Sequence, residues 1–168
     1  MKKLITVIAA SLLLGSSVFA EGYLSANDLA VGEIKANQNE EDGFVINASA
    51  EKIVVIEDKS KESVMCDGEK IVNRLSTKGS GNAKERSVSF PAKSGETIYI
   101  YAQSSGKSGS RPVHVINADG AEIAEVAAGS YTETKDVKAA KVKVPANGTY
   151  TVYPTGGTLY IYMIKVAK

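Results

Sequence analysis

The chain has 168 residues, a formal net charge of +1 and 43% hydrophobic residues. This length suffices for one domain with a sizeable core, and the near-neutral charge argues against nucleic acid or an anionic membrane as a bulk electrostatic partner. Cys66 is the single cysteine, which excludes an internal disulfide. No histidine lies near it in sequence, so we expect a buried, small apolar residue and not a reactive thiol.

Residues 1–20 have the pattern of a secretory signal peptide. Lys2 and Lys3 precede an apolar run at 4–14, and the small residues of Val18-Phe19-Ala20 provide a cleavage site. The run is too short to span a bilayer, and no later segment resembles a membrane helix. We therefore expect no membrane insertion, and a secreted protein, periplasmic or extracellular, that begins near Glu21.

Residues 21–42 follow as a polar N-terminal segment that ends in the acidic run Glu40-Glu41-Asp42. Such a run could offer oxygen ligands to calcium, although a solvated loop is its usual role. Whether it holds a structural calcium stays open. We expect no other metal and no cofactor.

Ten segments from residue 43 onward predict β-strands. Each is rich in β-branched, aromatic or other apolar residues and is bounded by Gly, Asn, Asp or Ser, at spacings typical of an antiparallel sandwich or barrel. Helical periodicity is absent outside the signal peptide. We predict an all-β domain over 43–168, with strands at 44–48, 52–57, 70–75, 87–91, 97–102, 112–117, 122–127, 141–144, 149–153 and 158–166.

Alternation assigns faces to three of these strands. In 97–102, the aliphatic residues Ile98, Ile100 and Ala102 share one side, and Tyr99 and Tyr101 share the other. In 112–117 and 158–166, the expected groups are Val113 and Val115 inward with His114 outward, and Tyr160 and Tyr162 opposite Ile161 and Met163. The last strand is apolar on both faces, which predicts a central strand covered on both sides.

Catalytic patterns are missing from the sequence. His114 is the single histidine and has no partner pattern, and we find no nucleophile elbow, metal-ligand spacing or Gly-rich phosphate loop. We therefore expect a protein that is not an enzyme.

Three arginines stand among twenty basic residues, and all three lie in the central part of the chain, at Arg74, Arg86 and Arg111. A planar guanidinium makes a two-pronged bond to a carboxylate, which the point charge of lysine cannot imitate. The arginines therefore indicate either recognition of an acidic ligand or internal braces of loops, for example one against Asp67.

Residues 43–166 carry a series of short motifs that contains all three arginines. The motifs are Asp67-Gly68, Arg74-Leu75, Gly79 with Gly81, Arg86, Ser104-Ser105, Arg111, Gly148-Thr149-Tyr150-Thr151 and Ile161-Tyr162-Met163-Ile164. The series resembles the accessory β-sandwich module of secreted bacterial pectate lyases and pectin esterases. That module usually accompanies a catalytic β-helix, for which this chain leaves no room, and it often carries tryptophan, of which this chain has none.

The resemblance implies an antiparallel β-sandwich of jelly-roll type that binds carbohydrate without catalysis, in particular a uronate-containing polysaccharide such as pectin. Of the arginines, we expect Arg74 to be structural and Arg111 to be the better ligand, and the role of Arg86 stays undecided. The alternative is an envelope-associated structural or adhesin-like domain with a protein partner at the cell envelope. The candidate ligand-binding residues are Arg111, Arg86, Arg74, Lys78, Tyr99 and Tyr101.

Overall fold

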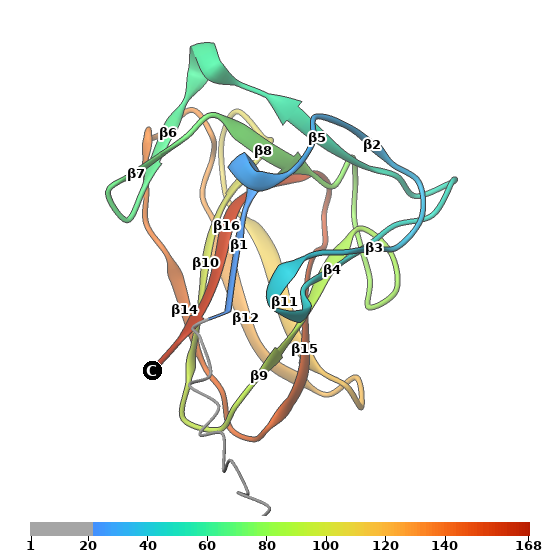
Figure 1. The fold of residues 1–168 in the computed structure, drawn as a ribbon. Helices are drawn as coiled ribbons and strands as arrows, with labels where there is room; N and C mark the ends of the chain where they lie inside the picture. Colours follow the sequence, from blue (N-terminus) through green and yellow to red (C-terminus); the bar gives the residue numbers. More distant parts are fainter. Residues whose placement is uncertain (1–21) are drawn as a thin grey trace, which may run out of the picture.

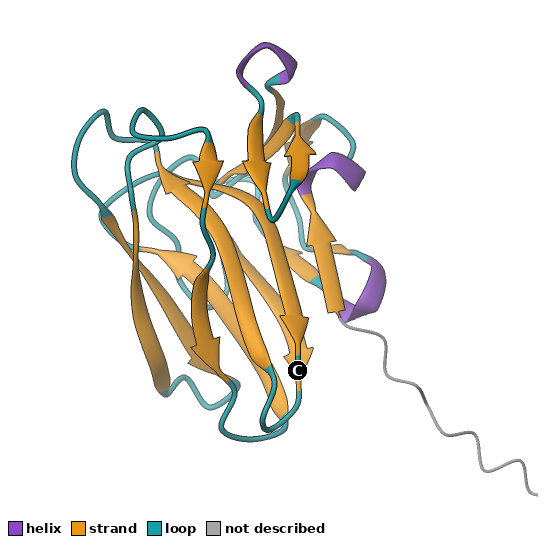
Figure 2. Ribbon diagram, turned by 90° about the vertical axis from the view of Figure 1, so that its left-hand side faces the viewer, coloured by secondary structure: helices purple, strands orange, loops and turns teal. Residues whose placement is uncertain are grey.

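Two antiparallel sheets pack face to face in the computed structural model, which describes residues 22–168 (Figure 1). The predicted signal peptide at 1–20 lies outside the described residues. The predicted all-β, jelly-roll sandwich is confirmed. Three short 3-10 helices occur among these described residues (Figure 2): η1 (Ala26–Asp28), η2 (Glu41–Gly43) and η3 (Ser60–Glu62).

The first sheet, sheet A, has the order β14 (Ala140–Lys143), β10 (Thr97–Ser104), β16 (Leu159–Ala167), β8 (Asn73–Ser76), β5 (Val54–Asp58) and β2 (Gly32–Ile34), with β1 (Gly22–Ser25) also paired to β16. Sheet B has the order β12 (Glu122–Ala128), β11 (Arg111–Asn117), β15 (Gly148–Pro154), β9 (Ser87–Ala92), β4 (Val45–Asn47) and β3 (Gln38–Asn39). A small third sheet contains β13 (Asp136–Val137), β6 (Val64–Cys66) and β7 (Glu69–Ile71), in which β13 and β6 run parallel.

The predicted strand at 70–75 is two strands in the structure, β7 in the small sheet and β8 in sheet A. The break falls at Val72 and Asn73, whose backbone N–H groups both donate to the side-chain oxygen of Asn27, at 2.8 and 3.2 Å. An asparagine thus takes the place of a strand partner, and the chain passes from one sheet to the other.

Residues 22–42 also supply strands to the sandwich. β1 pairs with β16, β2 with β5 and β3 with β4, so pairing begins well before residue 43. These strands have two to four residues each, and such short segments show no clear alternation in the sequence.

The main core fills the space between sheets A and B. Ile98 and Ile100 enter it from β10, and Val113 and Val115 enter it from β11, as the alternation predicts. Phe44 and Phe90 stack within it, with ring centroids 5.0 Å apart. Burial of this apolar surface is the main stabilising contribution to the fold.

A second core lies on the other face of sheet A, beneath the small sheet. Tyr101 and Tyr162 pack there with Cys66 of the small sheet. A β-bulge opposite Tyr101 and Ala102 breaks the alternation of β16, so Met163 follows Tyr162 into the second core. The expectation that Met163 shares a face with Ile161 was therefore wrong, while the prediction that β16 is covered on both sides is confirmed.

No helix among residues 22–168 is long and apolar enough to cross a membrane.

Cys66 should be chemically inert in the folded protein. It is fully buried in the second core, and burial raises the pKa of its thiol to about 12. Iodoacetamide at pH 8 should therefore leave the native chain unmodified by mass spectrometry, because the reactive thiolate is both scarce and covered. The same reagent should label the chain fully in denaturant. Rapid stoichiometric labelling of the native chain would contradict the assigned packing.

Candidate functional site

Four loop segments meet at one end of the sandwich, and all three arginines lie at this end. The segments are 77–86, 105–110, 129–135 and 155–158, and backbone hydrogen bonds join them. Ser105 N–H donates to the Thr158 carbonyl at 3.1 Å, and Tyr131 N–H donates to the Ser104 carbonyl at 3.1 Å. The fold thus gathers residues that are far apart in sequence.

Arg74 is held by two contacts inside the protein. Its Nε donates to Glu57 Oε2 at 2.8 Å, and its guanidinium carbon lies 3.4 Å from the centroid of the Tyr160 ring. Glu57 sits opposite Arg74 on the neighbouring strand β5. Arg74 is buried, so an added ligand would have little of its guanidinium to contact.

Lys78 shares the same carboxylate. Its Nζ lies 2.6 Å from Glu57 Oε1, with the lysine side chain 42% exposed. Burial alone would raise the pKa of Glu57, but hydrogen bonds from Lys78 and Arg74 outweigh it and hold that pKa below its ordinary value. Asp67, which we expected as a partner for an arginine, instead lies beside Tyr101.

Arg111 opens β11 and joins two loops. Its Nη1 donates to the Thr158 carbonyl at 2.6 Å and to Ser105 Oγ at 3.1 Å. The guanidinium lies against Gly157, where the β-carbon of any other residue would come within 2.5 Å of Nη1. Arg111 therefore already uses one of its guanidinium nitrogens on oxygens of neighbouring loops, and this nitrogen is less available to a ligand.

Arg86 shows a similar arrangement on the adjacent loop. It has φ of +54°, its guanidinium lies against Gly79, and its buried Nε has no hydrogen-bond partner. Glycine is required at 79 because φ is +143° there and a side chain would displace the guanidinium.

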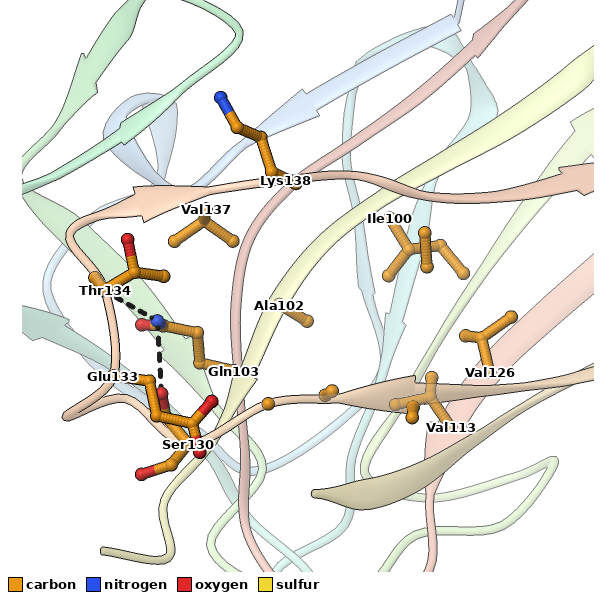
Figure 3. Close-up of a pocket in the computed structure, with 14 residues that line it drawn as sticks. Ile100, Ala102, Gln103, Val113, Val126, Ser130, Glu133, Thr134, Val137 and Lys138 are labelled. Atoms are coloured by element: carbon orange, nitrogen blue, oxygen red, sulfur yellow. Dashed lines mark hydrogen bonds between the residues drawn. The ribbon is translucent and has the colours of Figure 1, made fainter. Parts of the chain in front are cut away.

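A small pocket opens between the sheets near this end (Figure 3). Its volume is about 100 Å³, with aliphatic walls that include Ile100 and Val113. Gln103 closes it by donating to the carbonyls of Ser130 and Thr134, at 3.4 and 2.9 Å. Ligand pockets usually have volumes of about 300–1,000 Å³, so this cavity is too small for a sugar unit.

The open outer face of sheet A carries alternating lysine and tyrosine residues across four neighbouring strands. Lys141 on β14 is directly opposite Tyr99 on β10, which is opposite Lys165 on β16, which is opposite Tyr23 on β1. Side chains that are opposite in register project from the same face. We call these four residues the Lys–Tyr row.

A pocket of about 460 Å³ lies at the β14 end of the row. Tyr99 and Lys141 belong to its wall, and Lys141 Nζ lies 5.4 Å from the centroid of the Tyr99 ring. Lys138 and Asp136 add a second cation and a carboxylate, paired at 2.6 Å. The pocket therefore offers an aromatic face, two ammonium groups and acceptors for hydroxyl groups.

The two candidate tyrosines differ in their surroundings. Tyr99 is half-buried, whereas Tyr101 is only 5% exposed and belongs to the second core. Burial, together with the neighbouring Asp67 carboxylate, raises the pKa of Tyr101 to about 12. Both tyrosines line the pocket, Tyr99 with a half-buried ring and Tyr101 from the buried second core.

The acidic run Glu40-Glu41-Asp42 lines another pocket, of about 330 Å³, together with Asp28. Asp42 accepts the Tyr23 N–H at 3.2 Å, and Glu40 accepts from the Gln38 side-chain amide at 2.5 Å. The concentration of carboxylates makes this pocket unsuitable for an acidic ligand.

No protein-family model and no curated protein matches the chain. Solved structures resemble it at low identity. The M60 catalytic domain with the CBM51-1 and CBM51-2 domains of Clostridium perfringens ZmpB matches 88% of this chain at 15% identity and a TM-score of 0.44, and the chain spans 15% of that protein.

Two carbohydrate-binding modules match over almost their whole length. The C-terminal CBM6 of LamC, a marine laminarinase from Zobellia galactanivorans, is covered to 99% and covers 88% of this chain, at 14% identity and a TM-score of 0.38. The module CBM6cm-2 of Cellvibrio mixtus lichenase 5A, in complex with cellotriose, is covered to 96% of its length and covers 88% of this chain. Its sequence identity is 13% and its TM-score is 0.39. None of the three proteins is a pectate lyase or pectin esterase.

Substitution Arg74→Lys should destabilise the fold. Lysine keeps the charge but loses the planar contact with Tyr160 and the fixed bond to Glu57, at a cost of about 1–2 kcal/mol. Thermal melts should show a fall of roughly 3–8 °C. The control Lys78→Gln removes the exposed partner of the same carboxylate and should cost less than about 1 kcal/mol. An unchanged melting temperature for Arg74→Lys would contradict the bracing role.

The same variant should show a pH signature. The pKa of Glu57 is lowered from 4.5 in the folded state, so its ion pairs stabilise the protein fully above that pH and are lost as the pH falls through the lower, folded value. The difference in melting temperature between wild type and Arg74→Lys should therefore narrow on acidification below about pH 4.5. A constant difference down to strongly acidic pH would assign the loss to packing alone.

Substitution Gly157→Ala should also destabilise the protein. Position 157 has φ of +130°, and the added methyl would displace the Arg111 guanidinium. Strain of this kind costs about 1–3 kcal/mol, which thermal melts can measure. Gly148→Ala is the matched control, because a β-carbon there meets nothing within 4 Å and should change stability by less than about 0.5 kcal/mol. Equal effects at the two positions would refute the explanation.

Proposed function

We propose that the protein is a secreted, non-catalytic carbohydrate-binding domain that binds a uronate-containing polysaccharide such as pectin along the Lys–Tyr row. The observation that carries the proposal is the position of Tyr99 between Lys141 and Lys165 on one sheet face. The signal-peptide pattern at 1–20 supports secretion, which would bring the domain to extracellular polymers.

An aromatic ring between two cations fits an acidic sugar chain better than a neutral one. The ring of Tyr99 offers an apolar face to a sugar ring, and its hydroxyl can bond to sugar hydroxyl groups. Lysines on both sides attract the carboxylate that each uronate unit carries. The chain as a whole is nearly neutral, so this attraction is local to the row.

The cations of this proposal are lysines, not arginines. Arg74 donates to Glu57 and Arg111 donates to the loops, and we assign both arginines to the support of the fold. Lys78 shares the Glu57 carboxylate and stands apart from the row. Of the six candidates from the sequence, we retain Tyr99 as a contact residue and Tyr101 as its support.

Calorimetric titration with polygalacturonate tests the proposal, with a neutral galactan as the comparison ligand. Tyr99→Ala should weaken polygalacturonate binding at least about tenfold, as loss of a central aromatic contact does. Tyr153→Ala, on sheet B, is the matched control and should bind normally. Binding that is unchanged in Tyr99→Ala would exclude the row as the site.

The charge component has its own test. Lys141→Gln should weaken polygalacturonate binding about two- to fivefold at low salt, because exposed ionic contacts contribute about 0.2–1 kcal/mol. The loss should shrink as added salt screens the charge. Lys84→Gln, in the exposed loop before β9, is the control. Equal affinity for the neutral galactan would refute the uronate preference while leaving carbohydrate binding in place.

A further inference from the structure

His114 stands in a cluster with two carboxylates on the outer face of sheet B. Its Nδ1 lies 2.6 Å from Glu122 Oε2 and 3.8 Å from Glu125 Oε2. One potential metal-ligand atom from each residue lies within 4.8 Å of the other two. The imidazole is 15% exposed and the two carboxylates are 51% and 57% exposed, so ions can reach the cluster from solvent.

A β-bulge brings the two carboxylates to the same face. Residues three apart on a regular strand point to opposite faces, which would separate Glu122 from Glu125. The register of β12 against β11 shifts between Val115 and Ile116, and Ile123 and Ala124 both pack toward the core. Both glutamates therefore turn outward beside His114, the type of rearrangement that bulges produce at functional sites.

The imidazole ring is held in one orientation. Its Nε2 lies 2.9 Å from Thr155 Oγ1, and the ring stacks on Tyr153 with centroids 5.2 Å apart and planes 21° apart. A metal-bound histidine usually donates its second ring N–H to a polar partner, which fixes the tautomer. Without a metal, Nδ1–H donates to Glu122 at 2.6 Å; a metal that replaces this proton would leave Nε2–H to donate to Thr155 Oγ1 and the lone pair of Nδ1 directed toward the ion.

We propose that His114, Glu122 and Glu125 form a binding site for a divalent transition-metal ion such as Zn²⁺. An imidazole nitrogen favours zinc, nickel or copper, whereas calcium and magnesium take oxygen ligands. Zinc–ligand bonds of about 2.0–2.2 Å place tetrahedral ligand atoms about 3.3–3.6 Å apart. The observed 2.6 and 3.8 Å separations lie on either side of this range, and small rotations of the exposed glutamates can adjust both.

No second imidazole and no exposed thiol of this chain competes with the cluster for zinc. His114 is the single histidine, and the thiol of the single cysteine is fully buried with a pKa raised to about 12. A metal signal that depends on imidazole therefore has one possible origin. The chain should be studied without a histidine tag, which would add competing ligands.

Calorimetric titration with ZnCl₂ should show one site per chain, which His114→Ala and the double variant Glu122→Gln/Glu125→Gln abolish. Thr155→Val should weaken zinc binding about 10–100-fold, the usual effect of removing a partner of a metal ligand, and Thr155→Ser should restore it. Glu51→Gln, at an exposed position away from the cluster, should bind as wild type. Thermal melts of every variant verify that it is folded.

Nitrogen-15 NMR gives a readout that a purely structural histidine would not change. Zinc should shift the single Nδ1 resonance, and Nε2 should carry the ring proton in the zinc-bound form. CaCl₂ at the same concentration should leave both nitrogens unchanged. The proposal is overturned if zinc does not bind, if binding survives His114→Ala, or if calcium binds as tightly as zinc.

Discussion

Strand β16 is apolar on both faces, so both faces must be buried. This requirement decides which parts of sheet A are covered and which are exposed. One face belongs to the main core, and the other carries Tyr162 and Met163, which the small sheet covers. The cover extends over Tyr101 but ends near Tyr99, two residues earlier on the same face of β10. The Lys–Tyr row therefore lies at the edge of this cover, where Tyr23 and Tyr99 are half-buried against the second core.

The planar guanidinium groups of the arginines serve contacts within the protein. A guanidinium can satisfy several carbonyl or carboxylate acceptors at once while it lies flat against a backbone, provided that the adjacent residue has no side chain. Gly157 meets that condition for Arg111, and Gly79 leaves room for the Arg86 guanidinium in the same way. Arg111 thereby joins two loops from distant parts of the sequence, 105–110 and 155–158, at one end of the sandwich. In the proposed site, flexible lysines are better suited to a polymer whose carboxylates occupy no single position.

The sequence contains enough information to predict the class of fold and most of the long strands. Alternation in 97–102 and 112–117 identified the residues of β10 and β11 that enter the main core. The short strands β1, β2, β3, β6 and β13 escaped prediction, since two to four residues cannot establish a period. Both bulges escaped it too, because an extra residue changes which face each later side chain occupies.

The candidate sites were less predictable for a related reason. Lys141 and Lys165 lie in ordinary strands, and only cross-strand register places them on either side of Tyr99. Glu122 and Glu125 similarly meet His114 only through the bulge in the pairing of β11 with β12. The sequence indicated Tyr99 and Tyr101 as rings that could stack on a sugar, but the full burial of Tyr101 and the half-burial of Tyr99 depend on the small sheet.

The pairing of the first strand with the last has a mechanical consequence. Gly22, at the start of β1, lies opposite Val166, near the end of β16, so both ends of the strand pair leave the sandwich from the same place. Tension applied between these ends would open the pair like a zipper, one hydrogen bond after another. The load would never be shared by all the bonds at once, as it is when strands are pulled in shear. The β1 edge of sheet A is therefore the part of the fold that separates first when Gly22 and Val166 are pulled apart.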